Sequence, residues 1–201
     1  NAIKVNKGEL TVYQPLKCEQ IKAKTVEFKN GMEISCNSIN AESLTNGGDF
    51  TVNSELQVSS IVNQNKLTIA DTVTLIQQIS SLTNDAELNL NVDTSVEEIT
   101  NNQNGKITVA EGKYLVVSKN MKDIGTFDGK VKFSGSEQQS ITLNENTNYP
   151  HIVVDKDGGK ITFTNAITVE LFEKQAMSVC AKKKPQTKTS VSGSFFFSIA
   201  E

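Results

Sequence analysis

The 201-residue chain contains no arginine and no tryptophan, and it has only one histidine and three cysteines. All its basic side chains are lysines, and the net charge is -3, which argues against a nucleic-acid-binding protein with a clustered basic surface. Three cysteines cannot build a disulfide framework for a chain of this size. A single histidine cannot form a zinc site without cysteine or carboxylate partners. No apolar run approaches the roughly 18 residues that a membrane-spanning helix needs.

A four-residue pattern recurs along the chain: an apolar residue, two polar or small residues, and isoleucine. The spacing of roughly 20 residues indicates a repeat architecture rather than chance. We expect the isoleucines of the pattern to point inward and to stack from coil to coil. The copies begin at Cys18, Cys36, Val58, Ile76, Val96, Met121 and, in degenerate form, Tyr149.

Short apolar-polar-apolar triplets run in phase with this pattern, for example Phe50-Thr51-Val52 and Leu88-Asn89-Leu90. Such alternation is typical of half-buried strands, and turn signals such as Asn46-Gly47-Gly48 separate the triplets. We expect these glycines to supply positive φ angles. Several short strands per repeat predict an all-β parallel β-solenoid, or β-helix, of about seven or eight irregular coils. A β-sandwich of hairpins is the competing architecture.

The C-terminal part breaks the pattern. We expect a β-solenoid domain over residues 1–178, a lysine-rich linker over 179–190 and a C-terminal strand over 191–201. The strand carries Phe195, Phe196 and Phe197, which are too apolar to lie free on a monomer surface. It therefore either caps this chain's own sheet or pairs with a neighbouring subunit to form a homo-oligomer. The neighbour is the slightly favoured alternative.

Between residues 127 and 169 the spacing of glycine and apolar residues is specific. The first part contains Phe127, Gly129, Val131, Phe133, Gly135, Gln139 and Ile141. The second part contains Ile152, Val154, Gly159, Ile161, Phe163, Ile167 and Val169. This segment resembles a repeat of large bacterial cell-surface β-solenoid proteins of the adhesin type. The resemblance rests on structural residues, and it implies the fold and a surface location rather than an activity.

No set of residues assembles a convincing enzyme site. Glu97 and Glu98 are adjacent, so they point to opposite faces of a strand and cannot act as a carboxylate pair. Glu98 with Asp123 from a neighbouring coil is the remaining pair, although solvated outward charges explain both. We expect His151 to be a surface or turn residue.

The same absence applies to metals and cofactors. Asp155 and Asp157 lie in a turn that could ligate calcium, but the tandem aspartate pattern is missing. We therefore expect no catalytic residue, no metal and no cofactor. Cys18 and Cys36 occupy the same position in successive coils, where they are core thiols or, alternatively, a disulfide.

The sequence favours a non-enzymatic structural or adhesive module, located outside the cell or on its surface, that presents a rigid polar surface. The expected partner is a glycan or a host or neighbouring surface protein, with no nucleic acid and no membrane span. The alternatives are a carbohydrate-active lyase or hydrolase on the same fold, and a passive spacer in a larger surface protein or filament. The candidate binding residues are the outward side chains Glu19, Gln20, Gln77, Gln78, Glu97 and Glu98.

Overall fold

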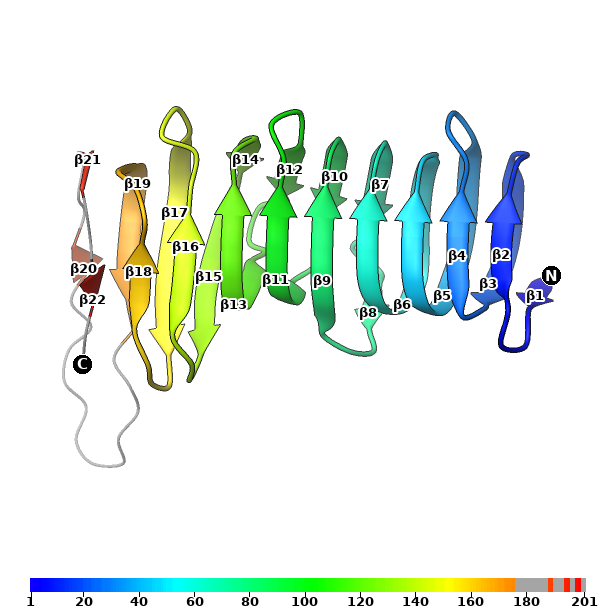
Figure 1. The fold of residues 1–201 in the computed structure, drawn as a ribbon, viewed down its shortest axis with the longest axis horizontal. Helices are drawn as coiled ribbons and strands as arrows, with labels where there is room; N and C mark the ends of the chain where they lie inside the picture. The colour runs from blue at the N-terminus through cyan, green and yellow to red at the C-terminus, as the bar shows by residue number, and fades with distance from the viewer. Residues whose placement is uncertain (176–187, 190–193, 196–197, 200–201) are drawn as a thin grey trace.

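The computed structural model describes residues 1–175, 188–189, 194–195 and 198–199. They form an elongated parallel β-solenoid of about nine turns with no helix (Figure 1). The predicted fold class is confirmed, and the predicted coil number of seven or eight was too low. The N-terminal turn, with strands β1 (Ala2–Lys4) and β2 (Glu9–Val12), contains no copy of the four-residue pattern, so counting copies missed it.

Each full turn of the solenoid contributes a strand segment to three faces. The long strand β5 (Glu33–Asn46) shows all three, because it bends twice: residues 33–36, 38–41 and 43–46 each run along a different face. A register shift between Cys36 and Ser38 marks the first bend. We call these the charged face, the mixed face and the hydroxyl face, in chain order.

Strands from successive turns pair in parallel on each face. The charged face consists of the first parts of β3 (Leu16–Lys22), β5 and β6 (Asp49–Asn63), followed by β7 (Lys66–Ile69), β10 (Glu87–Leu90), β12 (Lys106–Val109) and β14 (Thr126–Asp128). The mixed face contains β1, β8 (Thr74–Leu75), β15 (Lys130–Gly135) and parts of β3, β5, β6, β11 (Thr94–Asn101) and β13 (Leu115–Asp123). It continues with the second parts of β17 (Asn148–Lys156) and β19 (Ile167–Lys174), residues 151–156 and 171–174. The hydroxyl face contains β2, β4 (Thr25–Phe28), β9 (Ile79–Asn84), β16 (Gln139–Thr142), β18 (Ile161–Phe163) and the ends of β5, β6, β11 and β13.

Apolar side chains point inward from every face and stack on their counterparts in the next turn. Alternation along each strand places one residue in the core and the next outside, so in-register pairing generates continuous apolar columns. The column of the hydroxyl face consists of Leu10, Val26, Leu44, Ile61, Leu82, Ile99, Met121, Ile141 and Phe163.

The four-residue pattern marks the corners of the solenoid rather than one column. Ile21 stacks on Ile39 as predicted, but Ile39 then faces Leu56, and Ile61 faces Leu44 instead. Wherever the chain turns from one face to the next, two inward-pointing residues are separated by two residues at the bend. Each turn has more than one such corner, so the copies of the pattern along the sequence come from different corners. One predicted inward residue, Ile124, is 39% exposed.

The two stacked thiols are confirmed. Cys18 and Cys36 are paired in register, buried and free, with 3.3 Å between their Sγ atoms. Burial, together with the neighbouring Cys18, raises the pKa of the Cys36 thiol to about 12. The structure therefore contains core thiols rather than the alternative disulfide.

A row of buried asparagines forms the inner corner between the hydroxyl and charged faces. Four fully buried asparagines, Asn46, Asn63, Asn84 and Asn101, are followed in register by the fully buried Asp123. Each Nδ2 donates to the Oδ1 of the next turn, at 2.8, 2.7, 2.7 and 2.8 Å. The same amides donate to backbone carbonyls, as Asn84 does to Ala86 and Lys106. We call this set the amide ladder.

The amide ladder ends at Asp123 because a carboxylate has no hydrogen to donate. Its Oδ1 accepts from Asn101 and from the Gly125 amide, and its Oδ2 accepts from the Tyr149 hydroxyl. Burial, followed by the Asp123 charge and this hydrogen bond, raises the pKa of Tyr149 far above its usual value. Asp123 is thus an inward ladder residue, which corrects its predicted outward position and its pairing with Glu98.

Glycines next to the ladder are required for close approach. A Cβ on Gly105 or Gly125 would overlap the Asn101 amide. A Cβ on Gly48 would overlap the carbonyl oxygen of Met32, one turn earlier. The expectation that Gly47 and Gly48 supply positive φ was wrong, since neither is among the positive-φ glycines.

The backbone of the C-terminal segment pairs with the last turn. Strand β20 (Lys188–Thr189) and strand β21 (Ser194–Phe195) run antiparallel to β19, and β22 (Ser198–Ile199) runs antiparallel to β18. This arrangement agrees with the capping alternative, and part of the predicted linker takes part in it. Phe196, Phe197 and Cys180 lie outside the described residues. Pairing with a neighbouring subunit stays a prediction.

Replacing Ile39 by aspartate should prevent folding. Ile39 is buried between Ile21 and Leu56, so an aspartate there would be an unpaired charge in the core, at a cost of about 4 kcal/mol or more. Circular dichroism and chemical denaturation would measure it. Thr51→Asp, on an outward position of the same solenoid, is the control and should stay within about 1 kcal/mol of wild type. Near-wild-type stability of Ile39→Asp would contradict the register.

Replacing Asn84 by alanine should destabilise the fold by about 3 kcal/mol. The change leaves the buried Asn101 Oδ1 without the Asn84 donor and removes one of the three acceptors of Asn63 Nδ2, which keeps only the carbonyls of Asn65 and Glu87. It also opens a cavity in the buried corner. The outward Asn89→Ala is the matched control, with an expected loss of less than about 0.5 kcal/mol. Urea denaturation of both variants would measure the difference, and equal losses would contradict a structural role for the ladder.

The raised pKa of Tyr149 predicts a loss of stability at high pH. An unfolded tyrosine ionises near pH 10, whereas folded Tyr149 stays neutral, so its contribution is complete below about pH 10 and declines above it. At pH 8, Tyr149→Phe should cost about 1–3 kcal/mol because Asp123 loses a donor. The difference in the free energy of unfolding between wild type and Tyr149→Phe, measured by urea denaturation, should become smaller from pH 10 to pH 11. A gap that is constant with pH would contradict this.

Candidate binding surfaces

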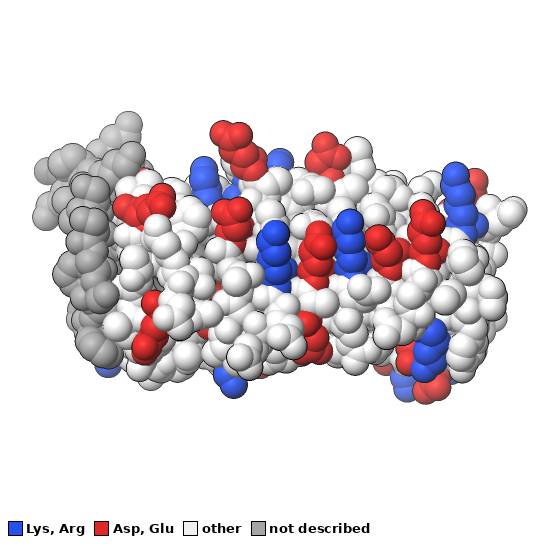
Figure 2. Space-filling model, turned by 90° about the horizontal axis from the view of Figure 1, so that it is seen from above, with Lys and Arg blue, Asp and Glu red and all other residues white. Residues whose placement is uncertain are grey.

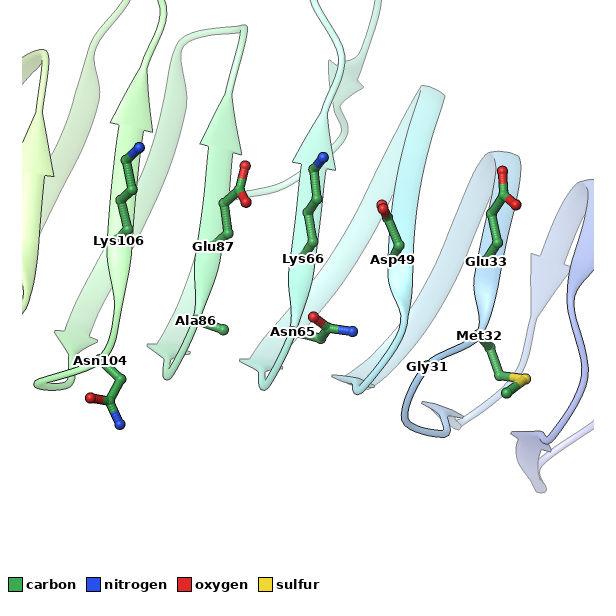
Figure 3. Close-up of a pocket in the computed structure, with 10 residues that line it drawn as sticks. All are labelled: Gly31, Met32, Glu33, Asp49, Asn65, Lys66, Ala86, Glu87, Asn104 and Lys106. Carbon is green, nitrogen blue, oxygen red and sulfur yellow. The ribbon is translucent and has the colours of Figure 1, made fainter.

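The charged face carries a row of ionisable side chains along the long axis of the solenoid. Glu33, Asp49, Lys66, Glu87 and Lys106 are direct neighbours in consecutive turns. Figure 2 shows acidic and basic side chains in a row on this side of the molecule, and Figure 3 shows the five side chains pointing away from the sheet. We call these five residues the charged row.

The charged row is flanked by a neutral row and by a shallow groove. Two residues further along each strand lie Ser35, Thr51, Thr68, Asn89 and Thr108. On the other side, Met32, Asn65 and Ala86 help to line a groove of about 550 Å³. The surface is therefore flat along the strands and slightly hollowed at the corner.

Members of the charged row do not neutralise one another. Among the described residues, no ion pair joins two of them, although they stand one turn apart. Within the described part of the chain, the charged row makes one side-chain hydrogen bond, in which Glu87 Oε1 accepts from Asn89 Nδ2 at 2.9 Å. The charges thus remain directed toward solvent.

The hydroxyl face carries short neutral side chains in two rows. One row contains Thr25, Ser43, Ser60 and Ser81, and the other contains Thr45, Val62, Thr83 and Thr100. The Ser43 hydroxyl donates to Thr25 Oγ1 across one turn, at 3.3 Å. Over these turns the face presents hydroxyl donors and acceptors at the spacing of the strands, about 4.8 Å.

The predicted binding residues lie outside the core but do not form a single ladder. Glu19 is exposed, and one of its oxygens lies 3.3 Å from the N-terminal ammonium group. Gln20 lies on the mixed face opposite Ser38. Gln77 and Gln78 lie between β8 and β9.

Their polar contacts tie most of these residues to nearby turns. Gln77 donates to Ser59 Oγ at 3.0 Å, and Gln78 donates to Ser118 Oγ at 2.8 Å.

The two glutamates also contact the next turn. Glu97 pairs with Lys119 at 2.8 Å, and this hydrogen bond raises the pKa of Lys119. Glu98 accepts from Asn120 at 3.2 Å. The structure thus places these candidates at separate positions, and whether they bind anything stays a prediction.

His151 is buried rather than a surface or turn residue, which corrects the expectation. It is 9% exposed, and its Nε2 lies 3.2 Å from Glu173 Oε2. Its ring stacks edge-on to Tyr114, over which the ammonium groups of Lys130 and Lys132 lie at 5.5 and 5.2 Å. His151, Glu173, Tyr114 and Lys130 border an open cleft of about 600 Å³. Strand alternation does not account for this burial, because His151 pairs with the outward Lys130, whereas its neighbour Ile152 pairs with the inward Val131. His151 is covered instead by the neighbouring Tyr114 and Glu173 side chains.

The described residues contain no group of three or more histidine, cysteine or acidic side chains that could hold a metal ion. Asp155 instead lies 3.4 Å from the Lys132 ammonium group, and Asp157 is exposed in the turn. No helix that could cross a membrane occurs in the described part of the chain.

The stacked turns and outward rows define the chain as a parallel β-solenoid protein. No protein-family model, no curated protein and no solved structure matches it.

The amide ladder and the charged row were both missed at the sequence level, although each has a signal. The ladder follows an apolar-x-Asn pattern, as in Leu44-Thr45-Asn46 and Leu82-Thr83-Asn84. The charged row precedes an apolar residue, as in Asp49-Phe50 and Lys66-Leu67. These patterns gain meaning only when the residues are aligned turn by turn.

Proposed function

We propose that this chain is a non-enzymatic structural or adhesive module of an extracellular or cell-surface protein. The observation that supports this is the flat polar exterior, in which neutral and charged rows repeat in register along a rod. A rigid array of this kind can hold a glycan or a surface protein by many weak contacts at once. The resemblance of residues 127–169 to surface-protein repeats points to the same location.

The hydroxyl face is the first candidate for attachment, because stacked hydroxyls can bond to sugar hydroxyls without removing a charge from water. The outward residues Glu19, Gln20, Gln77, Gln78, Glu97 and Glu98 remain further candidates. In this mechanism the core sets the spacing of the rows, and the side chains supply the hydrogen bonds.

A binding array of glycans and extracellular-matrix proteins tests the proposal. The purified chain should be retained by at least one ligand. The double variant Ser60→Lys with Ser81→Lys should weaken that retention at least tenfold by changing the hydroxyl face. The matched control is Thr51→Lys with Thr68→Lys, which adds the same charge to the charged face. Equal retention of all three proteins would exclude the hydroxyl face as the binding surface.

A passive spacer is the second reading, and replacement of the segment distinguishes it. In the surface protein that carries this chain, an unrelated β-solenoid of the same length should abolish attachment if the chain binds. Unchanged attachment after that replacement would contradict the adhesive proposal and support the spacer.

The cleft beside His151 is the one observation that favours a carbohydrate-active enzyme. A buried imidazole next to Glu173 could exchange a proton with a substrate, and Glu111 and Glu170 also line the cleft. A reducing-end assay over plant, algal and bacterial polysaccharides should show no cleavage. Cleavage that is lost in Glu173→Gln would contradict the non-enzymatic proposal.

A further inference from the structure

Four members of the charged row form a set that is complementary to itself when its direction is reversed, and the fifth, Glu33, lies outside this alternation. From Asp49 through Lys66 and Glu87 to Lys106, the signs alternate as negative, positive, negative and positive. Read from the other end, the order is positive, negative, positive and negative. A second row that runs in the opposite direction therefore meets an opposite charge at every position.

We propose that two copies of this chain pair antiparallel through the charged face. The twofold axis lies in the plane of contact, runs along the strands and passes between β7 and β10. Asp49 then faces Lys106 of the second copy, and Lys66 faces its Glu87. Because the contact is isologous, each pair occurs twice.

The neutral row is compatible with the same axis. A twofold rotation about an axis along the strands places each row of one copy opposite the same row of the second copy, in reversed order. Thr51 then lies opposite Thr108 and Thr68 opposite Asn89, so no charge is buried against an apolar group. A parallel arrangement with the charged rows in contact would set Asp49 on Asp49 and Lys66 on Lys66, which like-charge repulsion disfavours.

Two properties of the charged row favour its pairing with a second copy. None of the four side chains takes part in an ion pair within the described residues, so a partner does not have to break one. Figure 3 shows these side chains on neighbouring strands of one copy. The spacing of about 4.8 Å per turn is the same in both copies, so the charges stay matched along the contact.

The expected dimer is weak and sensitive to salt. Four charges one turn apart span about 15 Å, so the contact is smaller than a standard interface and its dissociation constant should be micromolar or higher. Charges on a solvated face are also screened by ions. Association should be strongest at about 10 mM salt, where the Debye length is about 30 Å.

Charge reversal tests the proposal with the intact chain in sedimentation experiments up to about 1 mM protein. Lys66→Glu and Glu87→Lys each create two like-charge pairs and should weaken self-association tenfold or more. An equimolar mixture of these two variants should restore it, because every pair in the mixed dimer is again of opposite sign. The double variant with both changes should also dimerise like wild type.

Lys122→Glu is the matched control, since it makes the same charge change at an exposed position of the hydroxyl face. It should dimerise like wild type. Circular dichroism confirms that each variant is folded. A wild type that is monomeric at the highest concentration and lowest salt would overturn the proposal. It would also be overturned by self-association that survives Lys66→Glu, or by single variants that fail to associate when mixed.

Discussion

The amide ladder is the interaction on which the register of the solenoid depends. An asparagine side chain both donates and accepts, so one residue type can repeat in every turn and satisfy the one above and below it. Asn46, Asn63, Asn84 and Asn101 do this in a fully buried corner. A shift of register would leave these amides unpaired in the core, and an unpaired buried amide costs more than a lost apolar contact.

The chemistry of the ladder also explains where it stops. Asp123 accepts hydrogen bonds from Asn101 and Tyr149 but cannot donate one, so the next turn needs a different corner. Tyr149 fills that corner with a large ring stacked on Phe127, with 5.6 Å between ring centroids. The core beyond this point contains a further aromatic pair, Phe133 and Phe163, with 5.9 Å between ring centroids.

The same register organises the exterior. Since each turn repeats the orientation of the last, residues outside the core also form rows, and the type of residue in each row decides the character of the face. Alternating charges on one face and hydroxyls on another give the rod two chemically different sides. The proposed adhesion and the proposed pairing of two copies can therefore occupy separate surfaces.

The sequence by itself determined most of the strands, most of their inward residues, the solenoid class and the stacking of Cys18 on Cys36, because these depend on local alternation and turn chemistry. Which strand lies beside which was decided by the tertiary structure. The apolar-x-x-Ile pattern occurs at more than one corner of each turn, and turns differ in length, so its phase could not be read along the chain. The buried position of Asp123 and His151, the amide ladder and the charged row all depend on that phase, since residues far apart in the sequence become neighbours only after the turns are stacked.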